Sequence, residues 1–172
     1  MQEVADINIR TLQLDELDKM WCLRQQALID ANPDAGYTEH DASAASLEKD
    51  ADQSTVHVGA FIGGVLVGGL RLVMLDDKAR ARAQVSGGGY DVERVVVDRD
   101  LQGQHIGQRL MAYAEDEARR LGAQVLVLSS MPKQEIAVFY QTCGYVPTGH
   151  NQEWKGVNYP IMTKDLANAE SE

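Results

Sequence analysis

A strand that leads through a glycine-containing turn into a helix, and then into another strand, most constrains the fold of this 172-residue chain. Residues 90–97 (YDVERVVV) are rich in β-branched side chains, whereas residues 105–122 repeat apolar side chains at helical spacing. Residues 123–130 (AQVLVLSS) follow as a short apolar run. This order predicts that the two strands are parallel neighbours joined by the helix.

The rest of the chain predicts a mixed α/β protein of one domain over residues 1–172, since no repeat or linker divides it. The expected order of elements is β, α, α, β, β, β, α, β, α, β, β. Gly63 and Gly64 predict a hairpin turn within residues 56–75, and Asp15 is expected to cap the first helix. The polar residues 76–89 predict a mobile loop. The other expected elements are strand 7–12, a weaker helix at 40–51, helix 133–144 and closing strands at 145–150 and 158–166.

Composition limits the classes of function. The formal net charge of −10, with no basic stripe, disfavours nucleic acid as a partner. No run has the length of a membrane span, and residues 1–10 lack the pattern of a signal peptide, so no membrane association is expected. Cys22 and Cys143 are too few for a disulfide framework, which predicts a reducing, cytoplasmic location. We expect no metal site, because no ligand spacing links His40, His57, His105 and His150.

The turn at residues 102–108 lies where the predicted strand becomes the helix. The first N–H groups of a helix have no partner within it, so they can bind phosphate without basic side chains. The spacing of Gly103 and Gly107 does not match the dinucleotide fingerprint, and no Walker Gly-Lys-Ser/Thr is present. From these residues alone, a phosphate site and a turn that uses glycine only for its geometry both remain open.

Two sequence blocks carry a resemblance to a known family. They are Gln102-Gly103-Gln104-His105-Ile106-Gly107 and Ala137-x-Phe139-Tyr140-x-x-x-Gly144-Tyr145. Together they resemble the signatures of the GNAT superfamily, the acetyl-CoA-dependent N-acyltransferases, and within it the chain is similar to a bacterial ElaA-like branch. The resemblance implies a GNAT-like fold, which is a mixed, largely antiparallel sheet with two splayed parallel central strands flanked by helices. It also implies acetyl-CoA as the cosubstrate.

The resemblance assigns coenzyme contacts to the strand and the turn. In the family the coenzyme lies where the two parallel strands splay, so Val95, Val96 and Val97 would pair with the pantetheine arm. The pyrophosphate would be held by Gln102, Gly103, Gln104, His105, Ile106, Gly107 and Gln108. His105 replaces the central glycine of the family's motif. We expect it to be tolerated at a negative φ with its side chain in solvent; an imidazole that helps to bind phosphate is the alternative.

Acetyl transfer to an amine needs a base for the ammonium proton, a donor for the oxyanion and a donor for the leaving thiolate. Strand alternation places Asp91, Glu93, Val95 and Val97 on one face. Either carboxylate could be the base, and both could equally be solvated side chains. A backbone N–H of residues 95–97 is the expected oxyanion donor.

Tyr140 is the candidate acid, although the helical spacing of its apolar neighbours also fits a core aromatic. We expect Phe139 in the core and Cys143 as a small buried residue rather than a nucleophile, because no activating group is placed beside it.

The expected activity is therefore N-acetylation of a primary amine on a small molecule or peptide. The alternative is a non-catalytic module that binds acyl-CoA and regulates a partner. The acceptor site is expected to include the loop 76–89 and the residues Trp21, Arg24, Tyr37, Trp154 and Tyr159. Sheet-edge dimers are common in the resembling family, so a homodimer is compatible with the resemblance.

Overall fold

The computed structural model describes residues 6–31 and 44–167 of the chain. Tyr37 and the first part of the helix expected at 40–51 lie outside the described residues. The described strands are β1 (Ile7–Thr11), β2 (Val56–Ile62), β3 (Val65–Met74), β4 (Gly89–Val97), β5 (Val125–Ser129), β6 (Val146–Trp154) and β7 (Val157–Asp165). The described helices are α1 (Leu17–Ala31), α2 (Ala44–Ala51), α3 (Asp77–Ala83), α4 (Ile106–Arg120) and α5 (Gln134–Thr142), with short 3₁₀ turns at η1 (Leu14–Glu16) and η2 (Arg99–Leu101). The predicted order is confirmed, with α3 as an addition.

The strands form a mixed sheet in the order β1-β2-β3-β4-β5-β7-β6. β4 and β5 are parallel, as predicted, with Gly89 opposite Val125 and Asp91 opposite Val127. The pairs β1–β2, β2–β3, β5–β7 and β6–β7 are antiparallel. The fold is therefore the mixed, largely antiparallel α/β sheet that the sequence predicted.

The chain divides into two compact units, each of which is described by itself. Unit 1 comprises residues 1–72 and 94–114, and unit 2 comprises residues 73–93 and 115–172. The prediction of a single domain over residues 1–172 stays a prediction.

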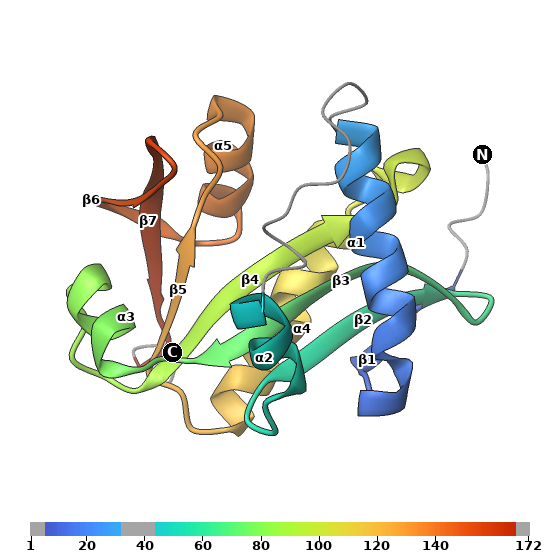
Figure 1. Cartoon of the computed structure of the whole chain (residues 1–172), viewed down its shortest axis with the longest axis horizontal. Helices are drawn as coiled ribbons and strands as arrows, with labels where there is room; N and C mark the ends of the chain where they lie inside the picture. The colour runs from blue at the N-terminus through green and yellow to red at the C-terminus, as the bar shows by residue number, and fades with distance from the viewer. Residues whose placement is uncertain (1–5, 32–43, 168–172) are drawn as a thin grey trace, which may run out of the picture. The chain divides into compact units, whose positions relative to one another are not determined.

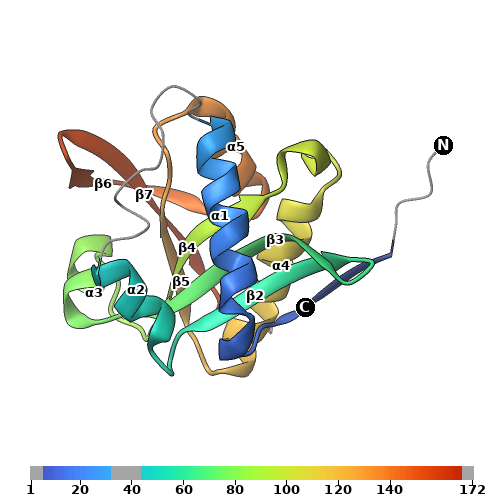
Figure 2. The ribbon, with the colours of Figure 1, turned by 45° about the vertical axis from the view of Figure 1, so that its right-hand side comes forward.

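The sheet of unit 1 is covered on both faces. α1 lies along one face of β2 and β3, and the first part of α4 lies along the other (Figure 1, Figure 2). Two successive glycines permit this close packing. A Cβ on Gly68 would lie 3.0 Å from Leu110 of α4, whereas one on Gly69 would lie 2.2 Å from Met20 of α1. Neighbouring residues of a strand point to opposite faces, so one glycine serves each helix.

The apolar core of unit 1 joins α1 to β2, β3 and the end of β4. Its buried side chains are Leu12, Met20, Phe61 and Leu66, with the partly buried Leu23 and Val96 packed against them. Each fully buried side chain of this size contributes about 1.5–3 kcal/mol relative to an exposed one.

The first helix begins differently from the prediction. Asp15 lies inside the 3₁₀ turn η1 and does not cap the helix. Glu16 Oε2 instead accepts from the backbone N–H of Gln13 at 2.9 Å, and both its oxygens bind Arg10. The Arg10 bond, with the Gln13 bond, lowers the pKa of Glu16 to about 2. The first turn therefore begins after Gln13 rather than at Asp15.

In unit 2, residues 76–89 are not the irregular loop that was predicted. Asp76 accepts from the N–H of Ala79 at 2.7 Å and caps α3. Ala83 is buried in the unit 2 core with Leu75, Val125, Val127 and Ile161. The alanine and arginine residues of this segment favour a helix, and Ala83 provides its apolar anchor.

None of the described helices is long and apolar enough to cross a membrane. In residues 6–31 and 44–167, no group of three or more His, Cys, Asp or Glu side chains is arranged to hold a metal ion.

Candidate active site

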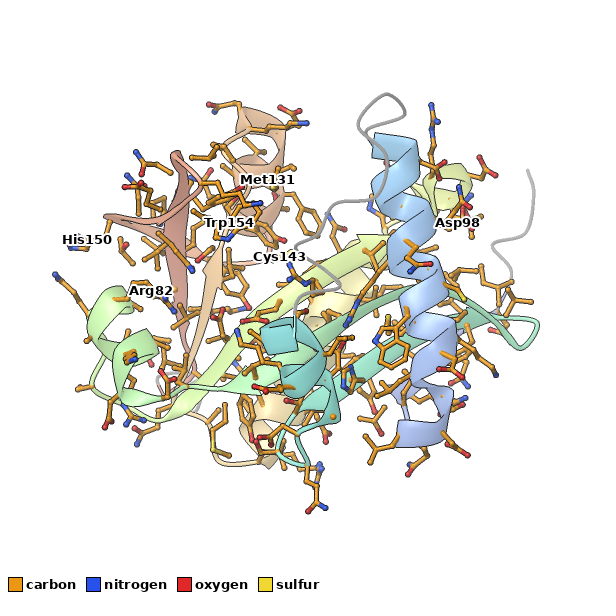
Figure 3. All side chains as sticks on the ribbon, in the orientation of Figure 1. Arg82, Asp98, Met131, Cys143, His150 and Trp154 are labelled. Atoms are coloured by element: carbon orange, nitrogen blue, oxygen red, sulfur yellow. The ribbon has the colours of Figure 1, made fainter. Side chains whose placement is uncertain are left out.

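The strand-to-helix turn of unit 1 is tied to the sheet at its entry. Asp98 follows β4, and its backbone N–H donates to the carbonyl of Val67 at 2.7 Å. Its side chain accepts from the N–H of Asp100 at 2.9 Å and caps η2 (Figure 3). The backbone that leads into residues 102–108 is thereby held at the end of β4.

Beyond this anchor, the turn presents free backbone donors. Over the described part of the chain, the N–H groups of residues 103–108 donate to no protein acceptor, and the first that does is Arg109, to the carbonyl of His105 at 3.1 Å. Gln102, Gly103, Gln104 and His105 are exposed. Free N–H groups at the N-terminus of a 15-residue helix fit a pyrophosphate, because they add to the positive end of the helix dipole.

His105 adopts a backbone conformation opposite to the predicted one. Its φ is +63°, so the expectation of a negative φ was wrong. Its side chain is exposed, as expected, and Nδ1 lies 2.9 Å from Oε1 of Gln108. Histidine is among the residues that adopt the left-handed region more often than most, and this local hydrogen bond favours the conformation further. The turn therefore needs a left-handed residue where the family's motif has glycine.

A glycine at position 105 should fit this backbone without strain. For His105→Gly, we expect a free energy of unfolding that is unchanged or higher by up to about 1 kcal/mol. The Michaelis constant for acetyl-CoA should change by less than about threefold, because the free donors belong to the backbone and no charged contact worth tenfold is removed. Urea unfolding and initial rates measure the two quantities. A tenfold loss of coenzyme affinity would instead assign the imidazole to the phosphate site.

β4 is irregular at its centre. Arg94 has a φ of +57°, which interrupts the extended backbone. The predicted alternation that places Asp91 and Glu93 on the same face as Val95 and Val97 therefore does not continue past Arg94. Asp91 and Glu93 are both partly buried and belong to unit 2. Their role as bases stays a prediction.

The three valines that follow are partly buried, and Val96 packs against the core of unit 1. Pairing of Val95, Val96 and Val97 with a pantetheine arm concerns their backbone and stays a prediction.

Tyr140 lies on α5 in unit 2. Its ring packs edge to face against Phe139 and Tyr145, with ring centroids 5.1 and 6.1 Å away. Burial, and to a lesser extent Cys143, raises the pKa of Tyr140 to about 12. Within the described residues, no hydrogen bond of its phenol oxygen to the protein is found. The phenol is thus a protonated donor at neutral pH that has not been used by the fold.

The neighbours of Tyr140 are less buried than predicted. Phe139 and Cys143 are only partly buried, so neither is the fully enclosed core residue that helical spacing suggested. Cys143 follows the last turn of α5 (Figure 3). Burial raises the pKa of its thiol, which opposes the thiolate that a nucleophile needs.

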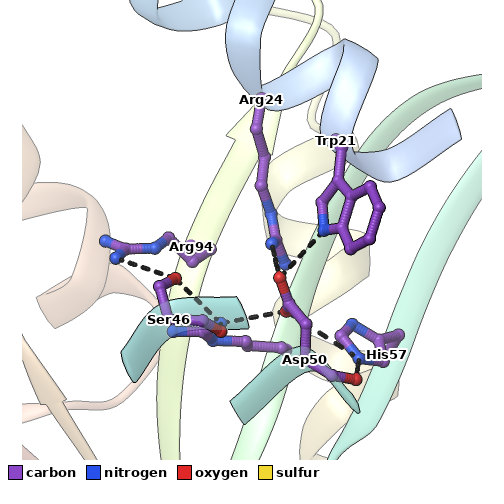
Figure 4. Close-up of polar contacts among 7 residues, drawn as sticks. Trp21, Arg24, Ser46, Asp50, His57 and Arg94 are labelled. Atoms are coloured by element: carbon purple, nitrogen blue, oxygen red, sulfur yellow. Dashed lines mark hydrogen bonds and ion pairs between the residues drawn. The ribbon is translucent and has the colours of Figure 1, made fainter. Parts of the chain in front are cut away.

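A buried polar cluster in unit 1 was not predicted. Asp50 of α2 is 1% exposed, and its carboxylate accepts from Nη1 of Arg24 at 3.0 Å and Nη1 of Arg71 at 2.9 Å (Figure 4). Nε1 of Trp21 donates to the same carboxylate at 2.9 Å. His57 donates from Nε2 to the backbone carbonyl of Asp50 at 3.0 Å. The cluster therefore joins α1, α2, β2 and β3 through a single residue, Asp50, whose carboxylate binds α1 and β3 and whose backbone carbonyl binds β2.

Electrostatics keep Asp50 ionised. Burial opposes its ionisation, but the charges of Arg24 and Arg71 and the Trp21 hydrogen bond outweigh burial and leave the pKa lowered. For His57, burial is the largest influence and lowers its pKa, so the imidazole is neutral at pH 7. The sequence signal for this cluster was a charged or polar residue inside an apolar strand, as in VHV (56–58) and LRL (70–72).

The residues expected at the acceptor site belong to both units, and their shared role stays a prediction. Arg24 is buried against Asp50, whereas Trp21 is partly exposed and contacts the same carboxylate. In unit 2, Trp154 and Tyr159 are partly buried, and the ammonium of Lys155 lies 4.8 Å from the centre of the Trp154 ring.

The profile of the acetyltransferase (GNAT) family matches residues 17–145. No curated protein sequence matches the chain.

Solved structures share the fold at low sequence identity. PaiA N-acetyltransferase from Thermoplasma acidophilum, in complex with coenzyme A, is 17% identical, with a TM-score of 0.68 over 93% of this chain and 99% of that one. Escherichia coli ElaA is 17% identical, with a TM-score of 0.69 over 94% of this chain and 100% of its own. The ribosomal-protein-S18-alanine N-acetyltransferase from Escherichia coli is 16% identical, with a TM-score of 0.69 over 95% and 96% of the two chains. With the family match over most of its length, the chain belongs to the acetyltransferase (GNAT) family.

Proposed function

We propose that the protein is an N-acetyltransferase that moves an acetyl group from acetyl-CoA directly to a primary amine of a small molecule or peptide. Membership of the family already makes it an acyltransferase with acetyl-CoA as cosubstrate. The observation that carries the proposal is the row of free backbone N–H groups at residues 103–108. These donors fit the coenzyme's pyrophosphate and need no net basic charge, which suits a chain with a net charge of −10.

Acetyl-CoA supplies the activated acyl group as a thioester. In our proposal the backbone of residues 95–97 pairs with the pantetheine arm, and Gln102 to Gln108 hold the pyrophosphate. Asp91 or Glu93 takes the proton from the acceptor ammonium, directly or through water, so that the amine has a free lone pair. A backbone N–H of residues 95–97 donates to the oxyanion.

Tyr140 completes the transfer by donating its proton or a hydrogen bond to the departing thiolate. The raised pKa of its phenol, about 12, keeps it a donor at neutral pH. Its phenol oxygen, which accepts and donates nothing within the described protein, supports this assignment over a purely structural aromatic.

We propose only the chemical class of the acceptor, a primary amine on a small molecule or peptide. The S18-alanine N-acetyltransferase has a fold similar to that of this chain, and its name identifies a protein amine as its acceptor. An amine on a peptide or small molecule is consistent with this fold. The free thiols of Cys22 and Cys143 are in keeping with a reducing cytoplasm, where we place the protein.

Thiol release from acetyl-CoA across a panel of primary amines tests the proposal. We expect at least one class of amine to accelerate release well above the rate of hydrolysis. Acetyl-CoA binding without thiol release for any amine would favour the alternative, a non-catalytic module that binds acyl-CoA and regulates a partner.

Gly107→Val tests the phosphate site. A β-branched side chain in the first turn of α4 would stand between the helix N-terminus and the pyrophosphate, so we expect a loss of coenzyme affinity of tenfold or more. Ala112→Val is the matched control, because Ala112 is exposed on the same helix. Calorimetric titration with coenzyme A measures both. Equal affinities in the two variants would mean that the turn does not bind phosphate.

A further inference from the structure

A lysine from another element of unit 2 contacts the C-terminus of α5, where the helix dipole is negative. The last turn of α5 contains no basic residue. Lys164 of β7 donates from Nζ to the carbonyl of Cys143 at 2.9 Å and also forms an ion pair with Glu115 of α4. The side chains of Lys164 and Glu115 are 22% and 14% exposed. A cation here satisfies a carbonyl at the end of α5 and complements the negative end of its dipole.

Gly144 makes room for this lysine. Its φ is +93°, and a Cβ at this position would lie 3.0 Å from both Cε and Nζ of Lys164. The last glycine of the second sequence block is therefore needed for the approach of Lys164 as well as for the turn after α5.

Residues 143–145, which Lys164 contacts, are hydrogen-bonded to the backbone of α5 next to and at Tyr140. The N–H of Tyr145 donates to the carbonyl of Tyr140 at 3.1 Å, and the N–H of Gly144 donates to that of Gln141 at 2.9 Å. The buried ring of Tyr145 packs against the ring of Tyr140. Movement of residues 143–145 would therefore displace both the backbone and the ring of Tyr140.

We propose that Lys164, held by Glu115, is a positioning residue that sets the place of the Tyr140 phenol by fixing the turn at Cys143–Tyr145. The inference rests on the proposed role of Tyr140 as proton donor. Glu115 orients the ammonium, the ammonium holds the Cys143 carbonyl, and the following turn holds Tyr140. Misplacement of a catalytic group by about 1 Å can cost 100-fold in rate, so a contact distant from the reacting atoms can affect turnover.

Lys164→Met removes the charge but keeps most of the side-chain length. We expect single-turnover acetyl transfer to fall by about 10- to 100-fold, while affinity for coenzyme A changes by less than about threefold. Lys164→Arg should recover most of the rate, since a guanidinium can reach the same two partners. Lys19→Met is the matched control and should keep the wild-type rate, because Lys19 is an exposed lysine on α1 in the other unit. Glu115→Gln provides a second variant if Lys164→Met does not fold, and it should lower the rate in the same direction.

The decisive measurement is a double-mutant cycle. If Lys164 acts through Tyr140, then Lys164→Met should lower the single-turnover rate of acetyl transfer when Tyr140 is present. In a Tyr140→Phe background the same substitution should have almost no further effect on that rate. Equal slowing in both backgrounds would overturn the positioning role and leave the proposed role of Tyr140 intact. A wild-type rate for Tyr140→Phe alone would instead refute Tyr140 as the donor, and the positioning role with it.

Discussion

Tyr140→Phe should slow single-turnover acetyl transfer by about 10²–10⁴-fold, the range typical of lost acid–base catalysis. The substitution keeps the ring and its edge-to-face packing against Phe139 and Tyr145, so the fold should be unchanged. It removes only the hydroxyl group, which has no hydrogen-bond partner within the described residues and which burial keeps protonated by raising the pKa of Tyr140 to about 12. Rapid mixing of enzyme-bound acetyl-CoA with an acceptor amine measures the chemical step.

Tyr113→Phe is the matched control, because it removes the hydroxyl group of a partly buried tyrosine on α4. Its single-turnover rate should equal that of the wild type. Affinity for coenzyme A should be the same in both variants and the wild type. If a folded Tyr140→Phe protein transfers acetyl groups at the wild-type rate, Tyr140 is an ordinary aromatic of α5.

Asp50→Asn should cost about 3–5 kcal/mol of the free energy of unfolding, the range for removing one partner of a buried ion pair. The substitution preserves the shape of the side chain but removes the charge that the guanidiniums of Arg24 and Arg71 contact at 3.0 and 2.9 Å. The cost is large because Arg24 and Arg71 are themselves buried and would keep their charges beside a neutral amide.

Asp52→Asn provides the control for this stability measurement. Asp52 is exposed, and its carboxylate accepts from the N–H of Ser54 at 2.8 Å, a bond that the amide oxygen of asparagine can also accept. Asp52→Asn should lower the free energy of unfolding by less than about 0.5 kcal/mol, as for most surface substitutions. Urea unfolding measures both variants, and equal stabilities would show that Asp50 does not hold α2 to the unit 1 core. Since the pKa of Asp50 is lowered in the fold, its contribution is present at neutral pH and is lost as the pH falls below about 4 and through that lowered pKa.

Local patterns in the sequence predicted most of the elements correctly. The parallel pair β4–β5 followed from a strand–helix–strand order, which permits few topologies. The turn with free backbone donors followed from the position of residues 102–108 between a strand and a helix, because the free donors of a helix N-terminus do not depend on side chains. That this turn binds phosphate stays a prediction. The two sequence blocks identified the family, which the comparison then confirmed.

Features that depend on particular neighbours were missed. Residues 76–89 were predicted as a loop, because a polar segment gives no sign that Ala83 is buried in one core cluster with Val125 and Ile161. His105 was predicted at a negative φ, whereas the turn and Gln108 Oε1 hold it in the left-handed region. Arg94 likewise interrupts β4 where a pattern of alternating faces assumes regular backbone.

The strands, the parallel pair, the turn with free donors and the family could be predicted from the sequence, since these follow from periodicity and motifs over a few consecutive residues. The order of all the strands in the sheet came from the structure. Only the tertiary structure decided which charged residues are buried together and which hold the helix that carries Tyr140. Asp50 meets Arg24 and Arg71 across 26 and 21 residues, and Lys164 reaches Cys143 across 21. No local pattern encodes such pairs, because each depends on how separate strands and helices pack and on the cost of leaving a buried charge without its partner.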